Sequence, residues 1–288
     1  MLTRTTLKSA VLLLAAALGP QSAALADGQP LYFNVLNQRS IALTARYWNP
    51  ILGYVGQKSG VALELKLSKT TKENNAIAEK GAFHFLYTNH FFTPERDRLG
   101  YRVIARPVGP GIRAQIVARK DSPILSLKDL EGKDVAFASP DAFAAYWLPM
   151  DALMRAKVHV NTTFAGNQEA AFAQLSVSKV AAAGVNSTVM ERYARREGLE
   201  YRVLWTSDLY NDLCIMANPK LPAKTVAAVR DALVNMSKDP QGRKILEAGA
   251  ELLKIEGDLG FVASSNRDYD NYRAFFKTTL VKDLTRDK

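Results

Sequence analysis

The segment from Val135 to Leu148 reads VAFASPDAFAAYWL and changes character in its middle. Its first four residues are small or apolar and predict a short buried strand, whereas the residues after Pro140 have the composition of a helix. Ser139 fits the N-cap position, Pro140 the first helical position, and Asp141 complements the positive end of a helix. The unpaired backbone N–H groups make this segment either a plain helix start or a place where an anion binds.

The N-terminus has the pattern of a secretory signal peptide. Arg4 and Lys8 precede the apolar run 10–18, and Ala24-Leu25-Ala26 fits a cleavage site. We expect residues 1–26 to be removed after Ala26, which leaves an exported mature protein. The apolar run is shorter than the roughly 18 residues that a membrane helix needs, and no later segment reaches that length.

Composition and charge exclude several classes of protein. The chain has 288 residues, 48% of them hydrophobic, which suits one large or two ordinary domains and argues against disorder. The formal net charge is +10, but Lys and Arg are scattered and no nucleic-acid-binding motif accompanies them, so no nucleic-acid partner is expected. Cys214 is the single cysteine, which rules out an intramolecular disulfide, and its apolar neighbours predict a buried strand.

Strands and helices alternate in the first third of the chain. The pattern predicts strands over 31–36, 61–67 and 83–87, with an amphipathic helix after the first strand that ends at Gly60. This alternation is typical of parallel strands joined by crossover helices. The polar segments 37–40, 69–71 and 88–90 follow the strands, so we expect them at the carboxyl edge of a sheet, where ligands bind in open α/β folds.

A second alternating series occupies the middle of the chain. It follows a Pro- and Gly-rich crossing at 107–111, and a strand over 213–217 then leads back to helices that pack on the first series. We therefore expect an α/β protein with two lobes, each a mostly parallel sheet flanked by helices, and two hinge crossings. The expected boundaries are 27–113 for lobe 1, 114–210 for lobe 2 and 211–288 for the return to lobe 1. A ligand site between the lobes is the natural consequence.

Motifs of catalysis are missing from the sequence. His84, His90 and His159 belong to no HExxH motif, and the chain contains no G-x-S-x-G, Walker or GxGxxG pattern. Asp208 and Asp212 are close enough in sequence to act as an acid–base pair, but acids in loops are ordinarily solvated. We expect no catalytic residue, no metal site and no cofactor.

Several motifs are similar to those of the phosphate, phosphite and phosphonate-binding family of ABC-transporter solute-binding proteins. The resemblance extends over 31–276 and rests mainly on the segments IVARKDSPI at 116–124, LKDLEGK at 127–133 and 137–149, and on LWTS at 204–207 with Asn211-Asp212. It implies a type II periplasmic-binding fold, a periplasmic location and a site between the lobes.

The resemblance also implies a set of ligand-binding residues. In that family, Ser and Thr residues after the strand at 135–138 bind an oxyanion; here the loop reads Ser139-Pro140-Asp141-Ala142, the family's Gly-Ser-His reads 166–168 GNQ, and its acidic position reads 181–183 AAA. The loss of donors and the gain of Asp141 argue against a doubly charged oxyanion. The implied site is Arg39, Tyr47, Thr70, Tyr87, Asn89, Ser139, Phe143, Gln168, Asn186 and Asp212.

The expected function is the capture of a small solute, either an oxyanion or a small organic molecule, between two closing lobes. The expected partner is an ABC permease in the inner membrane, and the protein is expected to be a monomer. One alternative is a ligand-sensing protein that acts on a sensor kinase. A more distant one is an exported enzyme that uses the same cleft, which requires a titratable group with a perturbed pKa.

Overall fold

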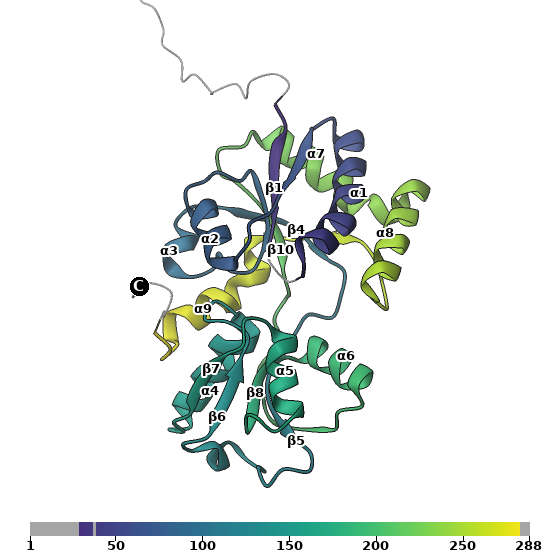
Figure 1. Ribbon diagram of the computed structural model, residues 1–288. Coiled ribbons are helices and arrows are strands. Elements are labelled where there is room, and N and C mark those ends of the chain that lie inside the picture. The colour runs from purple at the N-terminus through teal and green to yellow at the C-terminus, as the bar shows by residue number, and fades with distance from the viewer. Residues whose placement is uncertain (1–28, 37–38, 283–288) are drawn as a thin grey trace, which may run out of the picture.

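The computed structural model describes residues 29–36 and 39–282 and has two lobes, one above the other (Figure 1). The predicted signal peptide, together with Asn37 and Gln38 of the first polar segment, lies outside the described residues. Each lobe is built on one β-sheet with helices on its faces. The α/β class and the two-lobed arrangement expected from the sequence are confirmed.

Lobe 1 contains a six-stranded sheet in the order β11-β4-β10-β3-β1-β2. Its neighbours β2, β1 and β3 are parallel, whereas β10 runs antiparallel to both β3 and β4, and β11 is antiparallel to β4. The strands are β1 (Leu31–Val35), β2 (Leu63–Lys66), β3 (Phe85–Thr88), β4 (Arg102–Pro107), β10 (Cys214–Ala217) and β11 (Phe261–Ala263).

Lobe 2 contains a five-stranded sheet in the order β7-β6-β8-β5-β9. Strand β6 is parallel to β7 and β8, and β5 is antiparallel to β8 and β9. The strands are β5 (Ala114–Arg119), β6 (Asp134–Phe137), β7 (Asn161–Phe164), β8 (Ala182–Asn186) and β9 (Tyr201–Thr206).

Both sheets are therefore mixed, whereas the sequence favoured mostly parallel ones. The difference arises where the chain passes between the lobes. Strand β5 enters lobe 2 directly from lobe 1, and β10 returns from lobe 2, so neither follows a crossover helix within its own sheet, and each pairs in the antiparallel direction. At the junction, Ile112 and Tyr210 form an antiparallel bridge that holds the two crossings side by side.

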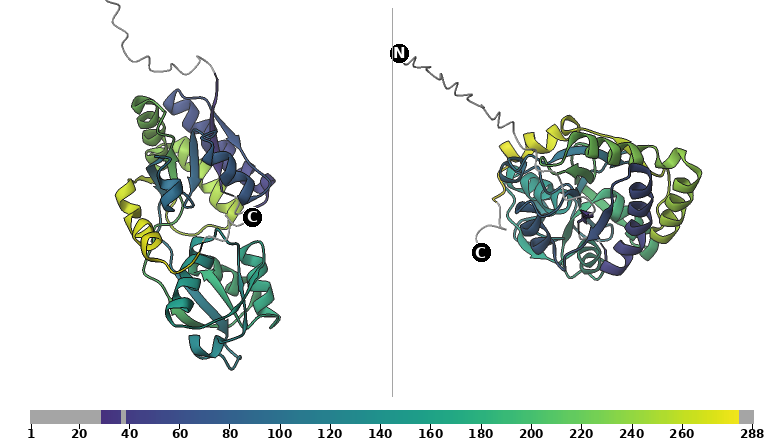
Figure 2. Two further views of the ribbon diagram at one scale, coloured as in Figure 1. Left: turned by 90° about the vertical axis from the view of Figure 1, so that its left-hand side faces the viewer. Right: turned by 90° about the horizontal axis from the view of Figure 1, so that it is seen from above.

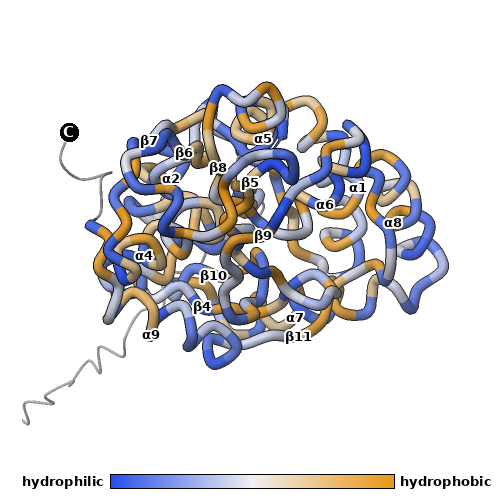
Figure 3. The backbone as a smooth tube through the Cα atoms, turned by 90° about the horizontal axis from the view of Figure 1, so that it is seen from below, coloured by the Kyte–Doolittle hydropathy of each residue, from blue (hydrophilic) through white to orange (hydrophobic). Residues whose placement is uncertain are grey.

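The helices cover both faces of the sheets, and along the outer helices apolar and polar positions alternate as one buried face requires (Figure 3). Those of lobe 1 are α1 (Ile41–Ser59), α2 (Thr71–Glu79), α3 (Pro94–Asp97), α7 (Ala223–Val234), α8 (Pro240–Leu253) and α9 (Asp270–Thr278). Those of lobe 2 are α4 (Leu148–Arg155), α5 (Gln168–Ser176) and α6 (Ser187–Glu197). Short 3₁₀ turns lie at 127–130 in lobe 2 and at 236–238 and 266–269 in lobe 1.

The helix after β6 begins later than its sequence indicates. A π-helical turn starts at Phe143 with Ala142 as N-cap, and it continues into α4. Ser139 does not cap it; the Ser139 carbonyl instead accepts a bond of 3.1 Å from the Ala142 N–H in a turn. The prediction of a helix start at Ser139 and Pro140 is wrong, because the buried side chains 143–147 fix the start of this helix.

One hydrophobic core extends through both lobes. It joins Phe91 and Tyr101 of lobe 1 to Phe137 and Ile116 of lobe 2, and Phe143 lies between them. Cys214 is fully buried in β10, as its neighbours predicted. Two smaller cores lie between the sheet of lobe 1 and helices α1 and α7, and between the sheet of lobe 2 and helices α5 and α6.

Candidate functional site: a cavity between the lobes

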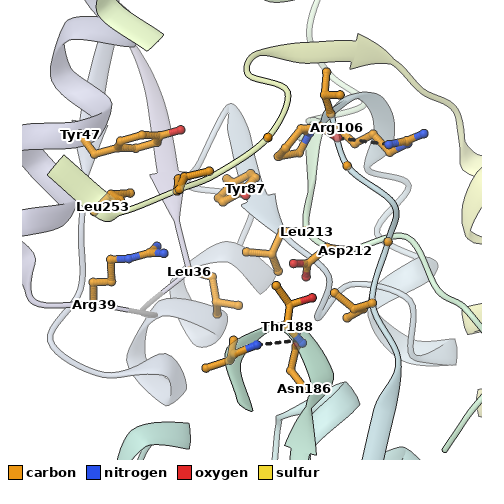
Figure 4. Close-up of a pocket in the computed structure, with 18 of the residues that line it drawn as sticks. Leu36, Arg39, Tyr47, Tyr87, Arg106, Asn186, Thr188, Asp212, Leu213 and Leu253 are labelled. Carbon is orange, nitrogen blue, oxygen red and sulfur yellow. Dashed lines mark hydrogen bonds between the residues drawn. The ribbon is translucent and has the colours of Figure 1, made fainter. Parts of the chain in front are cut away.

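A cavity of about 600 Å³ lies where the carboxyl ends of β1, β3 and β8 meet the start of β10 (Figure 4). Its walls come from both lobes and from the crossing between them. Lobe 1 provides the end of β1, the first turns of α1 and the segment 253–258, lobe 2 provides the start of α6, and the crossing provides 107–112. A cavity of this size suits a small solute.

Two opposite charges face this cavity without pairing. The guanidinium of Arg39 enters it from one side and the carboxylate of Asp212 from the other (Figure 4). Within the described part of the chain, neither has an ion-pair partner within 4.0 Å. Burial raises the pKa of the Asp212 carboxyl, and its bond to the Leu213 N–H and the positive charges of Arg39 and Arg192 offset part of this effect. The site therefore holds an exposed cation and a half-buried carboxylate, neither of which forms an ion pair with another described residue.

Two phenols add neutral hydrogen-bonding groups. Tyr47 on α1 and Tyr87 on β3 line the cavity, and burial raises the pKa of each phenol. Both remain protonated at neutral pH and can donate or accept a hydrogen bond. Leu36, Leu213 and Leu253 cover the remaining wall (Figure 4).

Gly249 fixes the place of the Tyr47 ring. A Cβ on this glycine of α8 would lie 2.8 Å from Cε2 of Tyr47, closer than nonbonded carbon atoms come. The ring therefore occupies space that any larger residue at position 249 would take, and it is held between α1 and α8.

We expect Gly249→Ala to destabilise the protein by about 1–3 kcal/mol, because the added methyl group displaces the Tyr47 ring. In a Tyr47→Ala background the added methyl group meets no ring, so the same substitution should cost much less stability. Denaturant unfolding of the two single variants and the double variant measures the coupling. An equal loss of stability in both backgrounds would contradict the assignment of Gly249 as the residue that positions Tyr47.

Half of the ten residues expected at the site line this cavity: they are Arg39, Tyr47, Tyr87, Asn186 and Asp212. Asn186 is the N-cap of α6, where its side-chain oxygen accepts bonds from the N–H groups of Thr188 and Val189. Gln168 lies one step behind it, because its Oε1 accepts a bond of 2.9 Å from the Asn186 N–H.

The other expected residues lie elsewhere. Thr70 is the N-cap of α2 and accepts a bond from the Glu73 N–H. Asn89 is buried, and its amide lies 3.4 Å from the hydroxyl of Tyr272. Phe143 is 3% exposed and stacks on Tyr272, and Ser139 forms part of the turn before it. The structure does not bring these residues to the cavity.

The structure adds residues that sequence reasoning missed. Thr188 and Arg192 reach the cavity from the first turns of α6, and Glu256 and Asp258 reach it from the loop after α8. The sequence could have indicated the start of α6, because this helix directly follows strand β8 and Asn186 was itself expected at the site. The loop after α8 carried none, because its position depends on how α8 packs against α1.

Two buried titratable groups near the lobe junction are neutral. Burial, together with the charge of Arg96, lowers the pKa of His90 to about 3, and burial raises the pKa of the Cys214 thiol. Within the described residues, no group of three or more His, Cys, Asp or Glu side chains is arranged to hold a metal ion. The same residues include no helix long and apolar enough to span a membrane.

Solved structures of bacterial binding proteins share this two-lobed fold. A binding component of a phosphonate ABC transporter from Pseudomonas aeruginosa is 19% identical, with a TM-score of 0.70 over 86% of this chain and 85% of that chain. PhnD1 of Prochlorococcus marinus, solved with methylphosphonate, is 14% identical, with a TM-score of 0.69 over 86% and 97%. The aliphatic sulphonate binding protein of Escherichia coli is 13% identical, with a TM-score of 0.57 over 86% and 91%.

The fold is thus the two-lobed α/β fold of these binding proteins. The chain belongs to the family of phosphonate periplasmic substrate-binding proteins of ABC transporters, whose sequence pattern it matches over residues 33–269. Among curated proteins, none matches the chain in sequence. The resemblance noted in the sequence and the solute-binding role that it implies are confirmed.

Proposed function

We propose that this protein captures a small zwitterionic solute in the cavity and presents it to an ABC permease. An anionic group of the solute binds Arg39, and an ammonium or another donor group binds Asp212. The observation that carries the proposal is the pair of opposite, unpaired charges that face one cavity from two sides. A solute that carries an anionic and a cationic group can form a charge-assisted bond with each of them at the same time.

The same arrangement disfavours a simple oxyanion. A dianion at Arg39 is repelled by the Asp212 carboxylate. Glu256 and Asp258 also line the cavity and offset the positive charges of Arg106 and Arg192. The N–H groups of Thr188 and Val189 at the start of α6 are already bonded to Asn186. The family description and the neighbour solved with methylphosphonate support a phosphonate group as the anionic part, and the charge of Asp212 supports an amine as the other part.

Export and transport complete the proposal. The leader at 1–26 directs the chain to the periplasm, where it acts with a membrane permease, as the family description indicates. The cavity offers contacts from both lobes, so closing the lobes around a solute increases its contacts with the protein.

Melting temperatures with a panel of solutes test this function. We expect an aminoalkylphosphonate or an α-amino acid to raise the melting temperature, because a ligand at about 100 times its Kd stabilises the folded state by about 2.7 kcal/mol. Inorganic phosphate and methylphosphonate should give no shift. The Arg39→Gln variant should lose the shift, whereas Arg46→Gln should keep it, because Arg46 is an exposed residue of the adjoining helix α1 that does not line the cavity. A larger shift with phosphate than with any zwitterion would overturn the proposal.

A further inference from the structure

The two sides of the lobe junction are built differently. On the side away from the cavity, Phe143 of lobe 2 stacks on Tyr272 of α9, with ring centroids 4.0 Å apart and planes inclined by 24°. Phe275 and Phe276 also contact Phe143, and Phe276 meets Trp147 edge to face at 5.2 Å. We call these five residues, Phe143, Trp147, Tyr272, Phe275 and Phe276, the aromatic clasp.

Helix α9, which carries three residues of the clasp, is fixed to lobe 1. Arg273 bonds both carboxylate oxygens of Asp97 in α3, at 2.8 to 3.0 Å. The Tyr272 ring lies 5.0 Å from Phe92, which is fully buried in lobe 1. A bidentate bond of this kind holds a helix in one orientation. The clasp is therefore a contact between the lobes rather than within lobe 2.

The segment after α9 continues onto lobe 2. Asp151 of α4 accepts bonds from the hydroxyl of Thr279 at 2.9 Å and from the N–H of Leu280 at 2.8 Å. Arg155 donates a bond of 2.7 Å to the Thr278 carbonyl. In the side view, α9 lies along the junction between the two lobes (Figure 2, left).

An ion pair lies beside the clasp. Arg96 of α3 lies 3.6 Å from Asp141 of lobe 2, and the two side chains are only 13% and 12% exposed. On the cavity side, by contrast, the lobes are joined by the pair Arg195–Glu256 at 3.5 Å, whose side chains are 71% and 86% exposed. An exposed pair contributes little to stability, whereas a buried aromatic cluster contributes much more.

We propose that the aromatic clasp holds the lobes together when no solute is bound, so that the lobes separate on the cavity side and pivot about Phe143. Opening on the clasp side exposes the buried rings of Phe143, Trp147 and Tyr272 to water. On the cavity side, the ion pair described between the lobes, Arg195–Glu256, is already solvated. The lobes open by the motion with the lower free-energy cost, and a solute therefore enters from the cavity side. The proposal concerns the solute-free protein and does not depend on which solute binds.

Distances between spin labels test the clasp in the solute-free protein. Lys72→Cys in α2 and Thr162→Cys in β7 place labels on the clasp side of lobes 1 and 2, and Glu247→Cys in α8 with Glu191→Cys in α6 places them on the cavity side. Each of these positions is exposed, and the native Cys214 is fully buried and escapes labelling. We expect a narrow distance distribution for the clasp pair and a broader one for the cavity pair. Equal widths would overturn the proposal.

Substitution of Phe143 separates the clasp from general packing. Phe143→Ala should broaden the clasp-side distribution and shift it to longer distances. Phe164→Ala, which removes an aromatic ring whose contacts are with Phe137 and Tyr146 of lobe 2, should leave it narrow. Where Phe143→Ala does not fold, Phe143→Leu, which keeps most of the buried volume but removes the ring that stacks on Tyr272, should broaden the same distribution. Asp141→Asn tests the ion pair beside the clasp. A clasp-side distribution that stays narrow in all folded variants would show that the lobes are held elsewhere.

Discussion

The Asp212→Asn variant should melt at a higher temperature than the native protein while it loses about 100-fold in affinity for a zwitterionic solute. The stability rises because the substitution removes a half-buried carboxylate whose pKa is raised in the folded protein and which has no ion-pair partner among the described residues. The affinity falls because truncating one partner of a buried charged contact typically removes 2–5 kcal/mol of binding energy. A substitution that increases stability and decreases affinity identifies a residue that serves binding at the expense of stability.

The stability of the native protein and its affinity for the solute should both depend on pH through Asp212. Because burial raises the folded-state pKa of Asp212, the carboxyl takes up its proton at a higher pH than in the unfolded chain. The stability that this proton confers is present below the unfolded pKa and is lost as the pH rises through the folded pKa. The affinity for a cationic group should change the other way and fall as the pH decreases through the folded pKa.

Thermal melting and calorimetric titration with an aminoalkylphosphonate, at several pH values, measure both effects. Asp208→Asn is the matched control, since Asp208 is an exposed carboxylate four residues away that does not line the cavity. It should change neither quantity appreciably. A decrease in both stability and affinity for Asp212→Asn would mean that Asp212 supports the fold instead of the solute.

The second large effect is expected at the crossing between the lobes. Gly111 has φ of +86°, and a Cβ there would lie 2.5 Å from the Tyr210 carbonyl oxygen. Gly111→Ala therefore combines an unfavourable backbone conformation, which costs roughly 1–2 kcal/mol, with a clash against backbone atoms. We expect a total loss of about 3 kcal/mol or more and a disturbed cavity wall, because Gly111 lines the cavity.

Chemical denaturation measures this loss, and Gly53→Ala provides the control. Gly53 lies inside α1, is exposed, and has no atom within 4 Å of its missing Cβ. Alanine at this position should stabilise the protein by about 1 kcal/mol, since glycine is a weak helix former. A Gly111→Ala variant as stable as the native protein would show that the two crossings can separate without loss.

Local sequence was sufficient for helix α1 and insufficient for the helix after β6. Helix α1 ends at Gly60 as the pattern indicated, and Trp48 lies on its buried face. The segment 143–147 is apolar on all sides, so its period cannot show where the helix begins. That start depends on Phe143 meeting Tyr272, a contact between residues far apart in the chain.

The candidate site shows the same division. Arg39, Tyr87 and Asn186 were expected near strand ends, and the structure places them on the cavity because strand ends share one edge of a sheet. Ser139 was expected there for the same reason, but the side chains of the clasp occupy its part of the junction. Tertiary packing determines which half of the cleft side chains fill and which half stays open, and this cannot be predicted from local sequence.

The place of β10 in the sheet of lobe 1 determines the order in which the chain can finish folding. Strand β10 pairs with β3 on one side and with β4 on the other, although more than 100 residues separate it from both. During synthesis or secretion from the N-terminus, β3 and β4 emerge early and keep an unpaired edge until residue 217 appears. All five strands of lobe 2 lie between residues 114 and 206, so that sheet can form in the meantime. Lobe 1, which contains the first strand of the fold, is therefore completed last.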